Sequence, residues 1–366
     1  MHRILHVIPS LDRSGAEKQL TLLAAGLPRT EFEVHVAALT RGGPLEAELR
    51  NAGIPVTVIG KRWKLDPAAF ARLERHIRAV APDLVHTWLF AANSYGRLAA
   101  LRAGVGHLVA AERCVDQWKS WHEFAVDRWL AKRTDRIVVN SPAISEFCVR
   151  HGLPAEKFTV IPNGVSPLPP DSTSRVELLR ELGLPRDARL IGTIGRLWPQ
   201  KRMKDLIWAT DLVKVVRDDV HLLIVGHGPQ RAQLERYRRL VHIDDKVHFL
   251  GHRSDVPRLL PHFDVLALAS GYEGLPNVVM EALITGVPVV ATDIPGSREL
   301  VVPGENGYLV GVGDRAGFAR YCLKIIEDPE LRSRLGAAGR RRMLDEFSVA
   351  RMVERHAALY RELLGG

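Results

Sequence analysis

The chain has 366 residues, of which 46% are hydrophobic and 25% charged, and its formal net charge is +9. This composition excludes a disordered or fibrous protein, and the length predicts about two domains. No apolar run reaches the ~18 residues of a membrane span, and the opening MHRILHVIPS is too short for a signal peptide, so a cytoplasmic protein is expected. The three cysteines, Cys114, Cys148 and Cys322, lie far apart, which argues against a disulfide framework or a Cys-based zinc site.

The positive charge is concentrated in the first half. Residues 1–165 carry 22 Lys and Arg against 16 Asp and Glu, whereas residues 166–366 carry 29 against 26. Such a surplus suits phospholipid head groups, pyrophosphate-linked lipids or nucleic acid, although simple solubility explains it as well. No recognised nucleic-acid module accompanies the charge, so nucleic acid is not an expected partner.

Short apolar segments alternate with helical patterns throughout the first half. The predicted strands are residues 3–9, 32–39, 56–59, 84–88, 108–111, 137–140 and 157–161, and a first helix is predicted over 16–27. Repeated strand–helix alternation predicts an α/β fold with a doubly wound parallel sheet. The first strand-to-helix turn, Ser14-Gly15-Ala16-Glu17, has a glycine and exposed amides where an anionic group can approach the backbone.

His86 lies near the end of the strand 84–88, and Asn93 is expected to begin or cap the helix that follows. A histidine at the carboxyl end of a parallel strand could meet a substrate hydroxyl. A buried histidine that is hydrogen-bonded to a neighbouring backbone group is an equally good interpretation.

Trp118, Trp121 and Trp129 have a spacing that would gather three indoles on one face of a single helix. The basic neighbours of these residues are Lys119, Arg128, Lys132 and Arg133. A helix that packs its aromatic stripe on the sheet is the common outcome of such a pattern. The alternative is contact with a membrane interface or a lipid groove.

Residues 162–174 are rich in Pro, Ser and Asn and read as an interdomain linker. A second alternating series follows, with strands predicted at residues 190–194, 221–225, 247–250, 264–269, 287–292 and 308–310. The two halves are therefore expected to have similar architectures, although no residue-level repeat relates them.

The stretch 269–286, ASGYEGLPNVVMEALITG, places Glu273 before a helix start and Glu281 after it. The helix is predicted to begin at about Leu275 or Pro276, and its first amides offer a place for an anionic group. Because the preceding segment reads as a buried strand, the turn should lie at the carboxyl end of a parallel sheet, where ligands bind. The alternative is that neither glutamate binds a ligand, with Glu281 a solvated helix residue and Glu273 an ordinary acidic loop residue.

Two cations follow the strand 190–194, within the sequence GTIGRLWPQKR. Arg196 comes directly after the strand, and Lys201 precedes the next helix. Facing a helix N-terminus, they could hold a diphosphate and stabilise the charge that grows on it as it leaves. Gly226 ends the next strand in a tight turn that suits close approach of a nucleotide.

With these residues identified, nearly the whole chain resembles the retaining glycosyltransferases of family 4. The most specific match is EGLPNVVME, which fits the family's E-x7-E motif, and the next is GRLWPQK. The resemblance implies the GT-B fold, with two Rossmann-like doubly wound parallel-sheet domains facing across a cleft. Residues 1–165 would bind the acceptor, with a last helix at about 348–364 packing back on them, and residues 166–347 would bind the nucleotide sugar.

The resemblance also implies roles for individual residues. Arg196 and Lys201 would bind the donor pyrophosphate, Glu273 the transferred sugar, and Glu281 the ribose. The predicted catalytic residues are Arg196, Lys201, Glu273 and His86. The predicted substrate-binding residues are Gly15, Glu17, Asn93, Arg113, His122, Gly226, Gly274, Leu275, Pro276, Asn277 and Glu281.

Two positions depart from the family pattern. Ser14 stands in place of the first glycine of a pair, and Trp88 stands where many relatives have a second histidine. The second departure leaves open whether His86 or His122 takes part in catalysis.

The expected activity is transfer of a hexose from a nucleoside-diphosphate sugar to an acceptor hydroxyl with retention of configuration. UDP-sugars are favoured as donors, with GDP-sugars next, and the acceptor would be a lipid-linked or polysaccharide precursor. No cofactor or metal is expected, and peripheral contact with the inner face of the membrane would run through residues 118–133. A nucleotide-sugar epimerase and a non-catalytic binding protein of the same fold are the alternatives.

Overall fold

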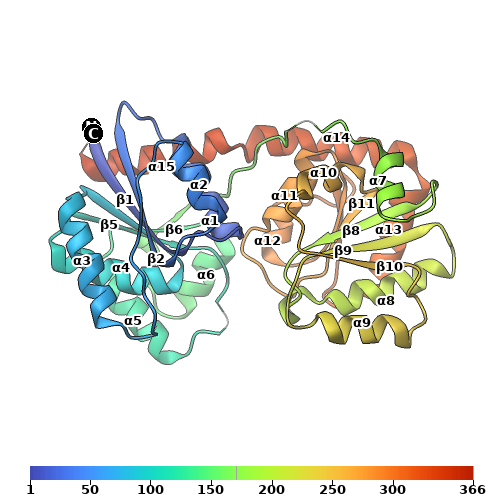
Figure 1. Ribbon diagram of the computed structural model, residues 1–366, viewed down its shortest axis with the longest axis horizontal. Coiled ribbons are helices and arrows are strands. Elements are labelled where there is room, and N and C mark those ends of the chain that lie inside the picture. The colour runs from blue at the N-terminus through green and yellow to red at the C-terminus, as the bar shows by residue number, and fades with distance from the viewer. Residues whose placement is uncertain (117, 170, 366) are drawn as a thin grey trace. The chain divides into compact units, whose positions relative to one another are not determined.

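The structure is a computed structural model that describes residues 1–116, 118–169 and 171–365. It divides into two compact units, Met1–Gly164 with Ser348–Gly366, and Val165–Phe347. Each unit is a parallel sheet with helices on both faces (Figure 1). The prediction of two Rossmann-like parallel-sheet domains is confirmed, and every predicted strand lies within two residues of an observed one at each end.

The first unit has a seven-stranded sheet in the order β3-β2-β1-β4-β5-β6-β7, and all its strand pairs are parallel. Its strands are β1 (His2–Ser10), β2 (Phe32–Arg41), β3 (Val56–Val58), β4 (Leu84–Trp88), β5 (His107–Glu112), β6 (Arg136–Val139) and β7 (Phe158–Val160). Its helices are α1 (Gly15–Gly26), α2 (Pro44–Asn51), α3 (Pro67–Val80), α4 (Leu89–Ala103), α5 (Trp121–Ala131), α6 (Pro142–Arg150), the short η1 (Ala155–Lys157) and the C-terminal α15 (Val349–Leu364).

Helix α15 belongs to the first unit because its apolar face completes that unit's core. Met352, Ala357 and Tyr360 are buried in one cluster with Leu20 and Leu23 of α1. The two helices approach so closely that a Cβ on Gly26 would come within 2.6 Å of Val353 Cγ2. The last helix of the chain is therefore part of the fold of its first residues.

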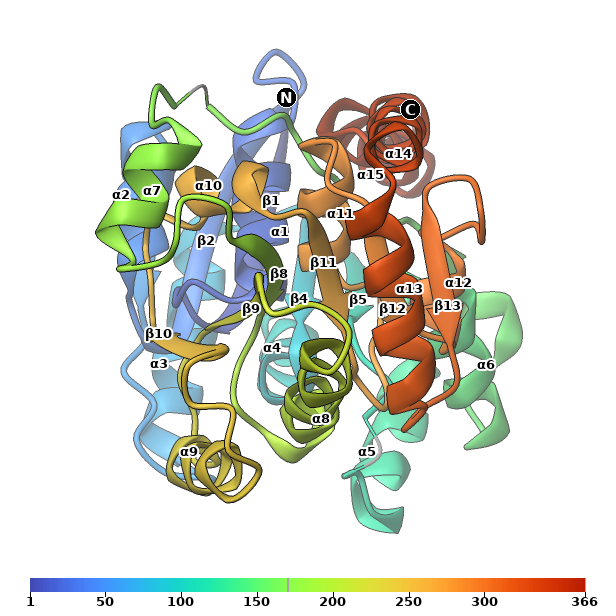
Figure 2. The ribbon, with the colours of Figure 1, turned by 90° about the vertical axis from the view of Figure 1, so that its right-hand side faces the viewer.

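The second unit has a six-stranded parallel sheet in the order β10-β9-β8-β11-β12-β13 (Figure 2). Its strands are β8 (Arg189–Ile194), β9 (Val220–Val225), β10 (Val247–Gly251), β11 (Val265–Leu268), β12 (Val289–Thr292) and β13 (Gly307–Val310). Its helices are α7 (Arg175–Glu181), η2 (Pro199–Lys201), α8 (Met203–Lys214), α9 (Arg231–Leu240), α10 (Val256–Leu259), η3 (Leu260–His262), α11 (Asn277–Ile284), α12 (Pro295–Arg298), α13 (Arg315–Glu327) and α14 (Pro329–Glu346).

Alternate residues of these strands build two separate cores, one on each face of the second sheet. On one face, Ile191 and Leu222 pack with helices α8, α9 and α13. On the other face, their neighbours Leu190 and Leu223 pack with α7, α11 and α14. Because both faces are covered, polar groups gather at the ends of the strands.

The strand order reverses at one place in each sheet. In the first sheet β1 and β4 are neighbours, and in the second β8 and β11 are. Open α/β sheets bind ligands at the carboxyl ends of strands at such a point. Within residues 1–116, 118–169 and 171–365, no helix is both long and apolar enough to cross a membrane.

Candidate functional site

The loops that follow β8 and β11 are joined by an ion pair between Lys201 Nζ and Glu273 Oε1. The two side chains are 72 residues apart in sequence and are only 16% and 12% exposed. Lys201 ends the short helix η2, and Glu273 lies in the turn before α11. The structure thus brings together two of the residues predicted to be catalytic, at the strand-order reversal of the second sheet.

Backbone hydrogen bonds fix the turn that carries Glu273. The Gly271 amide donates to the Gln200 carbonyl oxygen (2.8 Å), and Gln200 Nε2 donates to the Tyr272 carbonyl oxygen (2.7 Å). From the other side, Thr292 Oγ1 donates to the Ser270 carbonyl oxygen (2.5 Å). Sequence reasoning missed Gln200, for which the only signal is its place next to Lys201.

Arg196 is exposed at the same end of β8, and its guanidinium lies 5.6 Å from the centre of the Trp198 ring. It forms no ion pair with any residue that the structure describes. The two predicted diphosphate-binding cations therefore differ: Lys201 is already paired with Glu273, whereas the charge of Arg196 is available to a ligand.

Arg202, directly after Lys201, has a left-handed backbone conformation with φ of 49°. Its side chain donates to Asp205 (2.7 Å), and Arg315 donates to the other oxygen of the same carboxylate (2.8 Å). Such a conformation costs a non-glycine residue roughly 1–3 kcal/mol and persists only where its surroundings enforce it. Leu89, which follows β4 in the first unit, has a similar φ of 67°.

Gly226 and Gly228 allow the loops after β8 and β9 to pack against each other. A Cβ on Gly226, whose φ is 142°, would lie 1.9 Å from the Gly195 carbonyl oxygen. A Cβ on Gly228 would lie 2.5 Å from the Leu197 carbonyl oxygen. These glycines are required by the protein's own backbone, whatever else approaches them.

Helix α11 begins at Asn277, one or two residues later than predicted, and Pro276 is its N-cap. Proline has no N–H, so the amides at this helix start begin at Asn277. Leu275 is buried, and Gly296 of α12 packs on the turn so tightly that a Cβ there would lie 1.6 Å from the Gly274 carbonyl oxygen. Glu281 is on α11 and is partly buried.

His86 lies in the other unit and is 0% exposed. Its Nδ1 is 2.6 Å from the Tyr360 hydroxyl of α15, and its ring lies 4.9 Å from that of Trp88. Trp88 Nε1 donates to His6 Nδ1 (3.1 Å), and the His356 ring lies tilted at 5.9 Å from that of His86. The structure therefore places His86 in a buried aromatic cluster. This agrees with the interpretation of His86 as a buried, hydrogen-bonded histidine, except that its partner is the Tyr360 side chain and not a backbone group.

Burial keeps the histidines of this cluster neutral. It lowers the pKa of His6 and of His356 to about 3, and the cationic Arg113 adds to both shifts. The pKa of His86 is also lowered, first by burial and then by the neighbouring histidines.

Three other predicted substrate-binding residues are held by internal contacts in the first unit. Asn93 is buried one turn inside α4, so it neither begins nor caps that helix; it accepts from Thr87 (2.7 Å) and donates to Glu112 (2.9 Å). Glu17 is 5% exposed and accepts from the Ser14 hydroxyl. Arg113 follows β5, where its guanidinium stacks 4.1 Å from the Trp88 ring centre and donates to Asn163 (3.3 Å).

The remaining two predicted substrate-binding residues, Gly15 and His122, lie at the surface. Gly15 begins α1 and is exposed. The His122 side chain on α5 is 62% exposed, with Nε2 3.9 Å from Glu123.

The three tryptophans do not share one helix. Helix α5 begins at Trp121, after a capping box formed by Ser120 and Glu123, and Trp118 lies in the preceding loop. Trp118, Trp121 and Trp129 are all largely exposed. The interpretation of an aromatic stripe packed on the sheet is therefore wrong.

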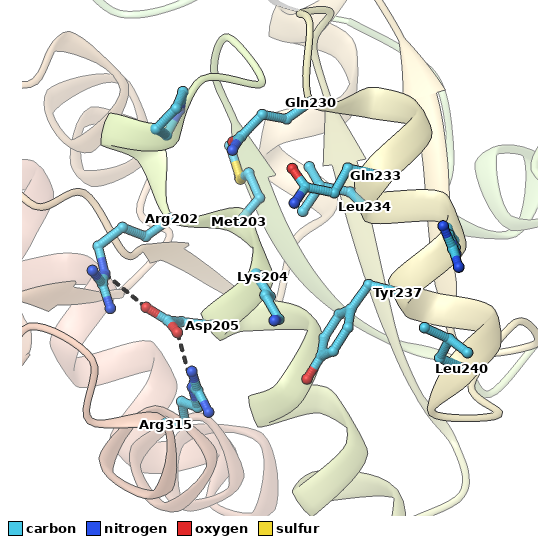
Figure 3. A pocket seen from close by; sticks show the side chains of 12 residues that line it. Arg202, Met203, Lys204, Asp205, Gln230, Gln233, Leu234, Tyr237, Leu240 and Arg315 are labelled. Atoms are coloured by element: carbon cyan, nitrogen blue, oxygen red, sulfur yellow. Dashed lines mark hydrogen bonds and ion pairs between the residues drawn. The ribbon is translucent and has the colours of Figure 1, made fainter.

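A pocket of about 480 Å³ lies between α8 and α9 (Figure 3). Met203 and Lys204 line it from one helix and Gln233 and Tyr237 from the other, and Arg202 is at its edge. Arg196, Lys201 and Glu273 do not line it, although Pro199 and Arg202, which lie on either side of Lys201 in the sequence, do.

Each unit matches a glycosyltransferase family model. Residues 13–167 match Glycosyltransferase Family 4, and residues 174–342 match Glycosyl transferases group 1. The putative glycosyltransferase EpsD of Bacillus subtilis is 30% identical over 90% of this chain and 89% of its own length. The UDP-Gal:alpha-D-GlcNAc-diphosphoundecaprenol alpha-1,3-galactosyltransferase of Escherichia coli is 26% identical, over 92% and 91%.

A third match is partial: this chain spans about half the length of N-acetyl-alpha-D-glucosaminyl L-malate synthase from Bacillus anthracis, at 31% identity. Among solved structures, Anabaena HepE in complex with UDP-glucose has a TM-score of 0.89 and 25% identity, over 99% of this chain and 100% of that one. Both halves of the chain match glycosyltransferase family models, the full-length relatives are named as glycosyltransferases, and the two Rossmann-like domains have the GT-B fold. The chain therefore belongs to glycosyltransferase family 4.

Proposed function

We propose that this protein transfers a sugar from a UDP-sugar to an acceptor hydroxyl with retention of configuration. The observation that carries the proposal is the Lys201–Glu273 pair at the strand-order reversal of the second sheet, together with Arg196, an exposed cation directly after β8 that pairs with no carboxylate in the described part of the chain. A UDP-glucose complex of a structural neighbour and a UDP-galactose-dependent relative support uridine as the donor base.

In this proposal Arg196 and Lys201 hold the diphosphate and stabilise the negative charge that it gains on departure. Glu273, positioned by Lys201, orients the transferred sugar, and Glu281 bonds the ribose. No carboxylate is assigned as a nucleophile, so the acceptor hydroxyl attacks on the face that the diphosphate leaves, and the leaving phosphate takes its proton. This chemistry needs no metal.

The acceptor would be a lipid-linked or glycan precursor bound by the first unit. The Escherichia coli relative is named for a diphosphoundecaprenol-linked acceptor, and the exposed Trp118 and Trp121, just before and at the start of α5, suit a protein that works on such a molecule at a membrane.

A thermal-shift series with UDP, GDP, ADP and CMP in EDTA tests the donor. A ligand at 100 times its Kd stabilises the folded state by ~2.7 kcal/mol. We expect UDP to raise the melting temperature of wild type, and Arg196→Gln to reduce that rise while Arg340→Gln, an exposed arginine on α14, leaves it intact. A response to GDP alone would change the donor, and no response to any nucleotide would refute the proposal.

Product analysis separates transfer from the epimerase alternative. An epimerase would convert the UDP-sugar in the absence of any acceptor, whereas a transferase needs the acceptor to release UDP at its full rate.

A further inference from the structure

Two loops of the first unit expose large apolar side chains at the carboxyl end of its sheet. The first, KRWKL at residues 61–65, lies between β3 and α3, and its Trp63 and Leu65 are 70% and 82% exposed. The second precedes and begins α5, and its Trp118 and Trp121 are 60% and 75% exposed. We name these four side chains the aromatic rim.

Both loops contact side chains in the first two turns of α4. On one flank, the Tyr95 hydroxyl accepts from the Asp66 amide (2.8 Å) and donates to the Lys64 carbonyl oxygen (3.0 Å). On the other flank, the Phe90 ring meets that of Trp118 edge-on at 5.3 Å. Phe90 and Tyr95 are separated by only ~7.5 Å along the helix axis. The two halves of the rim therefore stand at the same end of the α3–α4–α5 layer.

Two of the three cations in the first loop are exposed. Arg62 and Lys64 are exposed and form no ion pair with residues in the described part of the chain. Lys61 Nζ donates to the Trp63 carbonyl oxygen (2.5 Å) and lies 4.7 Å from the Tyr95 ring centre.

The carboxylates near the rim are held by the protein itself. Asp66 is 7% exposed and accepts from the amides of Arg62 (3.0 Å) and Ala69 (2.9 Å). Glu123 caps α5 through the Ser120 amide (3.0 Å), and Asp116 pairs with Lys119 (3.5 Å). The charge that the rim offers to a partner is therefore positive.

We propose that the aromatic rim docks on the surface of an anionic phospholipid bilayer. Indoles prefer the boundary between head groups and acyl chains, where the ring is apolar and the N–H stays wet, and lysine and arginine beside them attract anionic head groups. A protein partner fits less well, because lysine is depleted in the cores of protein–protein interfaces and here it alternates with the apolar residues. Docking deepens the proposed function, since it would hold the first unit against the layer that contains a lipid-linked acceptor.

Vesicle flotation of the full chain tests the proposal. We expect wild type to float with vesicles of phosphatidylcholine and phosphatidylglycerol and not with phosphatidylcholine alone, and binding to fall as salt is raised. The variants Trp63→Ala/Leu65→Ala, Trp118→Ala/Trp121→Ala and Arg62→Gln/Lys64→Gln should each weaken the partition by about tenfold. Matched controls are Trp129→Ala, an exposed tryptophan stacked by Arg133, and Arg340→Gln/Arg341→Gln.

Three results would overturn docking: wild type that floats with neither vesicle at low salt, rim variants that bind like wild type, or controls that lose binding as the rim variants do. The melting temperature of each variant is also measured with and without UDP. A rim variant that keeps the UDP-dependent shift but loses flotation supports docking. Flotation without any UDP shift in wild type would instead refute only the proposed donor chemistry.

Discussion

The strand-order reversals of the two sheets occupy equivalent places in similar folds but hold opposite kinds of residue. In the first unit, β1 and β4 place His6, His86 and Trp88 under Tyr360, and all four side chains are 0% exposed. In the second unit, β8 and β11 lead to a partly exposed Lys201–Glu273 pair and an exposed Arg196.

The difference shows that the fold topology provides a place for a binding site, but the side chains at that place decide whether a ligand can bind there. At the first reversal the returning helix α15 packs on one face of the sheet, so the buried polar side chains there bond to each other and stay neutral. At the second, a fixed turn holds the Lys201–Glu273 ion pair near the surface, and the exposed charge of Arg196 is available to a ligand. Chemistry that depends on charge is therefore expected at β8–β11.

We expect the largest difference between the two units at low pH, because acid should unfold the first unit before the second. In the unfolded chain His6, His86 and His356 bind protons near their ordinary pKa of 6.5, whereas burial lowers the folded pKa of His6 and His356 to about 3. Between these values the unfolded state binds more protons, so the free energy of unfolding falls as pH falls. The slope approaches ~1.4 kcal/mol per pH unit for each histidine well below pH 6.5, so His6 and His356 together lower the free energy of unfolding by about 3 kcal/mol from pH 6.5 to 5.

Limited proteolysis at pH 7 and pH 5, with the cleavage sites mapped, measures this effect. Burial also lowers the pKa of three histidines in the second unit, His221, His248 and His262, that of His248 to about 4, but none of them is fully buried, and the described residues of this unit contain no comparable cluster of fully buried imidazoles. We expect acid-induced cleavage to begin within residues 1–164. Earlier cleavage within 165–347 would contradict the prediction.

Glu273→Gln should reduce kcat/KM by ~100-fold or more, which corresponds to ~2.7 kcal/mol of lost transition-state stabilisation. The amide keeps the size of the side chain but removes the charge that pairs with Lys201. Steady-state transfer assays measure the loss, and Glu305→Gln, at an exposed site in the same unit, is the control. A variant with full turnover would remove Glu273 from the mechanism.

Tyr360→Phe should lower the free energy of unfolding by about 1–3 kcal/mol, because it leaves His86 Nδ1 buried without its partner. Urea unfolding measures the cost. The UDP-dependent thermal shift should remain, since the hydroxyl lies in the first unit. A large fall in kcat without loss of stability would instead assign His86 a part in catalysis.

Arg196→Gln should weaken UDP binding by about tenfold with little change in stability, as expected for an exposed cation that binds a diphosphate. Isothermal titration of UDP into wild type, Arg196→Gln and Arg340→Gln provides the comparison. Equal affinities for all three proteins would show that the unpaired cation is not part of the donor site.

Some local errors had signals in the sequence, and others had none. The start of α5 could have been found, because Ser120 and Glu123 have the spacing of a capping box, and this would have placed Trp118 outside the helix. The start of α4 carries no such signal, because the helix follows β4 directly through Leu89 in a left-handed conformation, and the sequence pattern therefore favours Asn93 as its beginning or cap.

The parallel sheets follow from the sequence, because strands buried on both faces are continuous apolar runs, and the motif spacing marks Arg196, Lys201, Glu273 and Glu281 as candidate site residues. Which polar residues are available to a ligand depends on the three-dimensional packing. His86 is buried by Tyr360, 274 residues away, and Lys201 meets Glu273 across 72 residues. Burial and charge pairing depend on these long-range contacts, which the local order of residues does not reveal.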